Sequence, residues 1–161
     1  NMVASIGNGG TLYRPQIIEK ITSVDGTVLE LFEPEVLNEI PASEDTLEAV
    51  KLGMELVIRD ERGTAFRRFT GLGTPVFGKT GTATTSIEDP HSWFAGFTDA
   101  NNPDKPDIAV AVILEFAGDG SAYAAPVFRR VIEAYFAGEV FTQYWWEWDI
   151  YITRTPAPDT E

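Results

Sequence analysis

A short run near the middle of the chain carries residue types suited to binding an anion: Gly78-Lys79-Thr80-Gly81-Thr82-Ala83. If the run is a β-strand, side chains alternate between its faces, with Thr80 and Thr82 on one face and Lys79 and Gly81 on the other. Two hydroxyls side by side can donate to one carboxylate, and the glycine between them leaves room for another group to approach. Lysine adds a positive charge and a proton donor. The run therefore predicts a site for an anionic ligand.

Lys79 is a positive charge in a chain that is strongly negative as a whole. The 161 residues include 12 Lys plus Arg and 25 Asp plus Glu, which gives a formal net charge of −13. An acidic surface without a basic stripe repels phosphate backbones, so we expect no nucleic-acid partner. A cation within a cleft of such a chain favours an anionic ligand through its local field.

Several other functional classes are excluded by composition. Cysteine is absent and His91 is the single histidine, so we expect no disulfide, no cysteine nucleophile, no metal and no cofactor. The longest apolar run, 108–114, is shorter than the roughly 20 residues that span a bilayer, and no signal peptide opens the chain. Its length and its 43% hydrophobic residues indicate one packed domain.

The first half of the chain supplies one hairpin and one long helix. Residues 1–10 indicate a helix tail that runs into glycines. Residues 11–33 predict a β-hairpin that turns at Asp25-Gly26, and Pro34 and Pro41 mark a connection after it. A helix is predicted over about 43–60. Three features define that helix: Ser43 as its N-cap, Gly53 on a closely packed face, and Gly63 as its stop.

The second half predicts a sheet. Three strands, at about 76–84, 92–98 and 107–116, are joined by turn-rich linkers short enough for antiparallel connections. The third is apolar on both faces, which is typical of a central strand covered on both sides. A helix over about 124–137 shows an apolar face that would cover the sheet. The fold class predicted is therefore α+β, an antiparallel sheet covered by the helices at 43–60 and 124–137.

Residues 139–161 form an aromatic-rich tail. Its aromatic residues are Phe141, Tyr144, Trp145, Trp146, Trp148 and Tyr151. Such density is typical of a contact surface, but rings of this size also gain stability by packing on their own domain, which is the interpretation we favour. From Thr155 onward we expect disorder.

A family resemblance now accounts for the central run. Lys79-Thr80-Gly81 matches the third motif of penicillin-binding proteins and class A β-lactamases. Other segments resemble the transpeptidase domains of class B penicillin-binding proteins in the same order: 9–15, Gly53-Met54, Gly63-Thr64-Ala65, 91–97 and 106–112. The resemblance covers about residues 2–137. It implies an incomplete β-lactamase/transpeptidase-like fold in which residues 1–138 are the C-terminal portion of the transpeptidase domain.

The resemblance also implies a role for each residue of the strand. Lys79 would hold a serine of the family's Ser-x-Asn motif and assist proton transfer. Thr80 and Thr82 would bind the terminal carboxylate of a D-Ala-D-Ala stem peptide or of a β-lactam. The backbone N–H of Thr82 would be one of two oxyanion-hole donors, so the implied catalytic residues are Lys79 and Thr82. Gly81 and Ala83 would line the substrate as it pairs with the strand.

The family's Ser-x-x-Lys and Ser-x-Asn motifs do not occur in the sequence. The serines that lack both patterns are Ser5, Ser23, Ser43, Ser86, Ser92 and Ser121. Without a nucleophile no acyl-enzyme forms, so we expect the isolated chain to be inactive and to need a helical half of the same protein. The uncovered surface would favour self-association or displaced loops at 84–91. The resemblance implies a location at the extracytoplasmic face of the bacterial membrane, and we expect no membrane anchor within residues 1–161.

Two other interpretations stay open. One is a D,D-carboxypeptidase or β-lactamase-related hydrolase that shares the Lys-Thr-Gly strand, and the other is a non-catalytic interaction module. We expect His91 to make a structural hydrogen bond rather than act as a base. Trp93 and Phe94 are expected in the core or the cleft wall. Arg67 and Arg68 either flank the cleft or lie on a solvated face.

Overall fold

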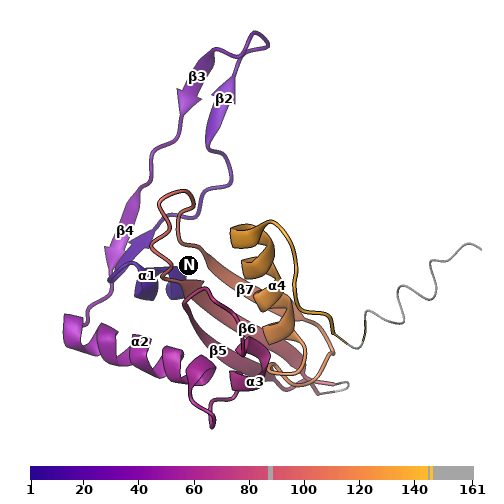
Figure 1. Ribbon diagram of the computed structural model, residues 1–161. Coiled ribbons are helices and arrows are strands. Elements are labelled where there is room, and N and C mark those ends of the chain that lie inside the picture. Colours follow the sequence, from indigo (N-terminus) through magenta and orange to yellow (C-terminus); the bar gives the residue numbers. More distant parts are fainter. Residues whose placement is uncertain (87–88, 145, 147–161) are drawn as a thin grey trace, which may run out of the picture.

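The computed structural model describes residues 1–86, 89–144 and 146. Figure 1 labels the elements, which are α1 (Met2–Gly7), β1 (Thr11–Tyr13), β2 (Lys20–Thr22), β3 (Val28–Leu31), β4 (Val36–Glu39), α2 (Glu44–Arg59), α3 (Phe66–Phe69), β5 (Val76–Ala83), β6 (His91–Thr98), β7 (Ala109–Leu114) and α4 (Ala124–Ala137). The expectations for Trp145, Trp148, Tyr151 and residues 155–161 lie outside the described residues.

The central sheet has the strand order β5-β6-β7 with both pairings antiparallel. Its register sets Thr80 opposite Phe94 and Gly81 opposite Trp93. With α4 packed across one face, the arrangement confirms the α+β class and the three strands predicted from the sequence. In the described part of the chain β5 is an edge strand, because β6 is its one neighbour in the sheet.

The predicted central position of β7 is not found within the described residues, where β6 is central and β7 lies at the other edge. Val112 faces the core at 9% exposure, whereas Ile113, one residue later, is 43% exposed. Helix α4 covers only one face of the sheet, and α1 reaches the other face near Phe97. Apolar residues on both faces of β7 therefore reflect two surfaces, of which α4 covers one and α1, within the described residues, covers only part of the other.

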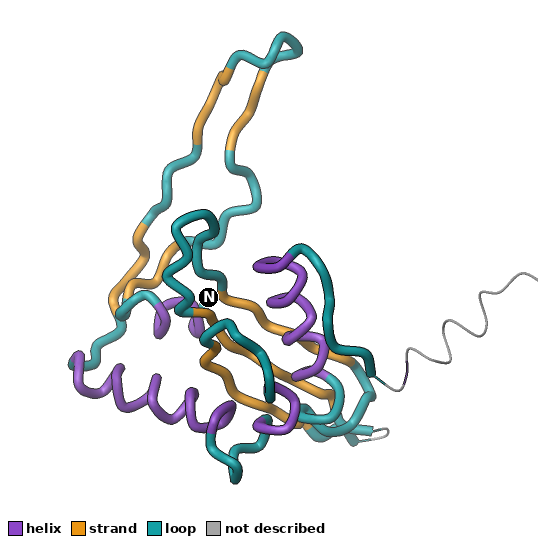
Figure 2. The backbone as a smooth tube through the Cα atoms, in the orientation of Figure 1, coloured by secondary structure: helices purple, strands orange, loops and turns teal. Residues whose placement is uncertain are grey.

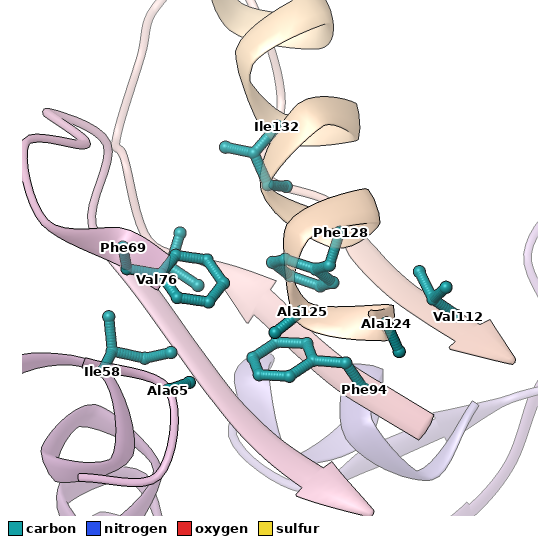
Figure 3. Close-up of a cluster of buried hydrophobic side chains, with 10 residues drawn as sticks. All are labelled: Ile58, Ala65, Phe69, Val76, Phe94, Val112, Ala124, Ala125, Phe128 and Ile132. Carbon is teal, nitrogen blue, oxygen red and sulfur yellow. The ribbon is translucent and has the colours of Figure 1, made fainter. Parts of the chain in front are cut away.

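The core lies between the sheet, α4 and the segment that joins α2 to β5 (Figure 3). Three rings form its centre: Phe94 of β6 lies 4.7 Å from Phe128 of α4 and 5.4 Å from Phe69 of α3, measured between centroids. Phe94 and Phe128 are fully buried. Each such burial contributes about 1.5–3 kcal/mol, so this cluster fixes α4 and α3 against the strands.

Helix α2 begins as predicted and packs against β5. The Ser43 side chain caps it by accepting a hydrogen bond from the backbone N–H of Thr46 at 3.3 Å. The close packing predicted around Gly53 is wrong, because a Cβ built there meets no atom within 4 Å. Gly53 therefore costs the helix about 1 kcal/mol relative to alanine with no packing gain in return.

An antiparallel arm extends away from the body, as Figures 1 and 2 show. The predicted hairpin is confirmed: β2 pairs with β3, and Gly26 turns the chain with a positive φ of 89°. At the base of the arm, β1 pairs with β4. The connection predicted between Pro34 and Pro41 thus contains a strand, because both prolines lie outside β4 and leave its backbone free to pair.

A buried ion pair on α4 holds the segment that follows the helix. Arg129 donates to Glu133 at 2.7 Å, and Glu133 also accepts from the backbone N–H groups of Phe141 and Thr142 at 3.1 and 3.3 Å. Burial opposes ionisation of Glu133, but these donors outweigh it and lower the pKa of its carboxyl group. Tyr144 is buried and stacks on Trp146 at 4.7 Å. The division of the chain at residue 138 stays a prediction.

Candidate active site

Strand β5 presents its threonines at an edge of the sheet. Thr80 and Thr82 share the face that carries Phe94, because directly paired residues of an antiparallel sheet lie on the same side. This face of β5 is buried in the core near Val76 and becomes exposed toward the other end of the strand. Thr80 is accordingly half-buried and Thr82 is exposed. Both hydroxyls are therefore accessible at the rim of the core rather than sealed within it.

The Lys79 ammonium lies beside the Thr80 hydroxyl, although the two side chains leave the strand on opposite faces. Its Nζ donates to the Thr80 backbone oxygen at 2.8 Å and lies 3.3 Å from Thr80 Oγ1. Alternation along the strand sets only the direction of the Cα–Cβ bond. The flexible four-carbon stem of lysine can then turn and bring the ammonium back to the edge of the sheet. The structure thus gathers an ammonium and a hydroxyl that strand alternation alone would separate.

A loop after α2 supplies a second hydroxyl to Thr80. Thr64 Oγ1 lies 2.9 Å from Thr80 Oγ1, and either oxygen can be the donor. Thr64 was singled out from the sequence only as part of the family resemblance, with no contact to the strand expected. Fifteen residues of sequence lie between Thr64 and Thr80, so local patterns carry no signal for this contact.

The loop between β7 and α4 contacts β5 near the C-terminal end of that strand. Gly120 donates its backbone N–H to Thr82 Oγ1 at 3.3 Å. A Cβ on Gly120 would lie 2.3 Å from the Gly81 carbonyl oxygen and 2.5 Å from that of Trp93. Only glycine permits this approach, so Gly120 is a site residue that the sequence analysis missed.

Three polar side chains anchor that loop. The Asp119 carboxylate accepts hydrogen bonds from the hydroxyl and the backbone N–H of Ser121, and these contacts hold the pKa of Asp119 below its usual value. Ser92 donates its hydroxyl to the Asp119 carbonyl at 2.9 Å. Arg68 donates to the Ser121 carbonyl at 3.0 Å, whereas Arg67 is exposed. Of the two arginines, Arg68 therefore supports the wall of the site.

Gly81 faces Trp93 rather than open space. A Cβ on Gly81 would lie 3.0 Å from the Trp93 Cβ, which is tighter than an ordinary van der Waals contact. The sequence analysis assigned the space at Gly81 to an approaching group. In the structure the missing side chain accommodates the cross-strand tryptophan, which is 38% exposed.

A family model described as the penicillin binding protein transpeptidase domain matches residues 1–133. The chain belongs to this family. The chain is 32% identical over 145 residues to the peptidoglycan D,D-transpeptidase MrdA of Haemophilus influenzae, a match that spans 80% of the chain and 21% of that protein. It is 30% identical over 144 residues to the PbpA transpeptidase of Mycolicibacterium smegmatis, across 83% of the chain and 27% of that protein.

Solved penicillin-binding proteins share the arrangement of elements. Penicillin-binding protein A of Mycobacterium tuberculosis, as a ceftriaxone acyl-enzyme complex, aligns with a TM-score of 0.69 and 27% identity over 84% of the chain and 31% of that protein. PBP2 of Pseudomonas aeruginosa, in complex with WCK 5153, aligns at 0.63 and 31% over 89% of the chain and 30% of that protein. The chain thus spans about a fifth to a third of these relatives.

The remaining polar candidates of this transpeptidase-family chain have structural roles. His91 accepts a hydrogen bond on Nδ1 from the Phe116 backbone N–H at 3.0 Å, which confirms the structural bond expected of it. Phe94 is part of the core, also as expected.

Among the described residues, acidic and histidine side chains form no group of three that could hold a metal ion. Nor does the described part of the chain contain a helix long and apolar enough to cross a membrane.

Proposed function

We propose that the chain is the C-terminal portion of a peptidoglycan D,D-transpeptidase domain that binds stem peptides and β-lactams. The observation that supports this most directly is the cluster on β5, where the Lys79 ammonium and the Thr80 hydroxyl lie within 3.3 Å at an accessible strand edge. An ammonium and neighbouring hydroxyls form charge-assisted hydrogen bonds with a carboxylate. Thr80 and Thr82 take the terminal carboxylate, with Gly81 and Ala83 lining the bound peptide.

In the proposed reaction a serine outside this chain attacks the peptide bond of D-Ala-D-Ala. Its proton passes to the amine of the departing D-alanine while the acyl group moves to the serine oxygen. An amine of a second stem peptide then attacks the acyl-enzyme, takes the acyl group and gives up a proton that returns to the serine oxygen. Lys79 stabilises negative charge and helps move protons near the nucleophile. The Thr82 backbone N–H is one of two donors to the tetrahedral oxyanion.

The relatives support this substrate class. The proteins from Haemophilus influenzae and Mycolicibacterium smegmatis carry the name peptidoglycan D,D-transpeptidase, and that from Mycobacterium tuberculosis forms a ceftriaxone acyl-enzyme. Such chemistry takes place on the cell wall, so the proposed location is the extracytoplasmic face of the bacterial membrane.

The sheet face opposite α4 is the proposed docking surface for the helical half of the same protein. Trp93 and Ile113 lie directly opposite each other on that face and are 38% and 43% exposed. An apolar surface of this kind associates when it is left uncovered. The chain alone is therefore proposed to self-associate.

Labelling with a fluorescent penicillin tests the proposed function. The complete protein, with its upstream region, is expected to become covalently labelled, and residues 1–161 alone are expected to stay unlabelled because they lack the nucleophile. An excess of unlabelled penicillin should abolish the signal. An unlabelled complete protein would exclude the β-lactam site, and a labelled isolated chain would show that its own residues supply the nucleophile.

A further inference from the structure

We propose that Thr64 is a positioning residue that aims the Thr80 hydroxyl hydrogen at the carboxylate of the ligand. The proposal rests on the function proposed above and adds to it a residue outside the strand. Thr64 comes from the loop after α2, and its hydroxyl oxygen lies 2.9 Å from that of Thr80 on β5.

The side chain of Thr80 can take part in three hydrogen bonds. Its hydroxyl has two lone pairs and one hydrogen, whereas the Lys79 ammonium can only donate. Lys79 Nζ lies 3.3 Å from Thr80 Oγ1 and therefore uses one lone pair. If Thr64 donates to the other lone pair, the Thr80 hydrogen is left for an outside acceptor.

The opposite polarity would work against an anionic ligand. If Thr80 donated to Thr64, its hydrogen would be used within the protein and it would turn a lone pair toward an incoming carboxylate. A carboxylate has only acceptor sites, so this arrangement loses a hydrogen bond and adds repulsion. A bound carboxylate therefore selects the state in which Thr64 donates to Thr80 and Thr80 donates to the ligand.

The loop that carries Thr64 is held on both sides. A Cβ on Gly63 would lie 2.4 Å from the Leu56 carbonyl oxygen and 2.5 Å from that of Val57, so the loop lies directly against the end of α2. Ala65 is 1% exposed and donates its backbone N–H to the Val57 carbonyl at 3.1 Å. Thr64 lies between these fixed neighbours, so its hydroxyl is positioned before any ligand arrives.

Replacing Thr64 with valine keeps the side-chain shape and removes the donor. In the complete protein we expect Thr64→Val to lower the second-order rate of acylation by penicillin roughly tenfold, because the Thr80 hydroxyl loses the partner that fixes its orientation and its hydrogen bond to the charged ligand weakens. Thr64→Ser retains the hydroxyl and should restore most of the rate. Thr70→Val is the matched control, because Thr70 donates its hydroxyl to the Phe66 carbonyl and does not contact Thr80.

A penicillin methyl ester separates positioning from general damage to the site. The ester removes the charge of the carboxylate, so wild-type protein should react with it more slowly than with the free acid. In Thr64→Val this difference should shrink by roughly the same tenfold factor, since the Thr80 hydroxyl of the variant is no longer held in the orientation that donates to the carboxylate. Loss of stability alone would slow both compounds equally.

The outcomes separate the two proposals. If wild-type complete protein is not acylated, the proposed function is wrong. If it is acylated and Thr64→Val matches the wild type and Thr70→Val, or if Thr64→Val slows the acid and the ester equally, Thr64 has no positioning role. A valine-specific loss, rescued by serine and confined to the free acid, supports it.

Discussion

Replacing Lys79 with methionine is expected to slow acylation of the complete protein by penicillin at least 100-fold while leaving the fold intact. Removing one preorganised group that faces developing charge costs about 10²–10³ in rate in other acyl-transfer enzymes. Lys79 is exposed, and its ammonium contacts the oxygens of Thr80 rather than the core. Methionine keeps the length of the stem and removes the charge.

Lys20→Met is the matched control for Lys79→Met. It makes the same change in net charge at an exposed position of β2, on the arm. Acylation rates measured with a fluorescent penicillin should be unchanged in Lys20→Met, and the melting temperatures of both variants should match the wild type. Equal rates for Lys79→Met and the wild type would remove Lys79 from the chemistry.

Gly120→Ala is expected to damage both the stability and the site. The added Cβ would overlap backbone oxygens of Gly81 and Trp93, which cannot move aside as a flexible side-chain end can. The loop must lift from the sheet, at a cost of about 3 kcal/mol in the free energy of unfolding, and Thr82 loses the donor on its hydroxyl. The melting temperature and the acylation rate should both fall.

Gly53→Ala makes the same chemical change where the structure leaves open space. A Cβ at Gly53 has no neighbour within 4 Å, so alanine should raise stability through its higher helix propensity. The contrast between the two variants isolates the close approach at Gly120. Acylation and melting temperature that stay at wild-type values in Gly120→Ala would show that the loop does not pack on β5 as described.

Local patterns were sufficient to predict the elements that carry their own signals. Helix α4 occupies 124–137, as its apolar spacing predicts, and α2 begins after the Ser43 cap. The Asp25-Gly26 pair marked the hairpin, because a positive φ at that position favours glycine. Strand β5 and the placement of its threonines on one face likewise follow from the sequence.

The remaining features depend on contacts between distant segments. The Thr64 and Gly120 contacts come from loops that approach β5 only in the folded chain, so no periodicity marks them. The edge position of β7 depends on strand order, which its apolar composition does not encode. At Gly53 the low helix propensity of glycine suggested a close packing partner, but a glycine can also occur in a helix without a close neighbour.

A crystal structure of the complete protein acylated by a penicillin tests the central claim most directly. We predict a ligand carboxylate within hydrogen-bonding distance of the Thr80 and Thr82 hydroxyls, and an acyl oxygen that accepts from the Thr82 backbone N–H. The acylated serine should lie outside residues 1–161. A carboxylate bound away from both threonines, or an acyl group on a residue of this chain, would contradict the account.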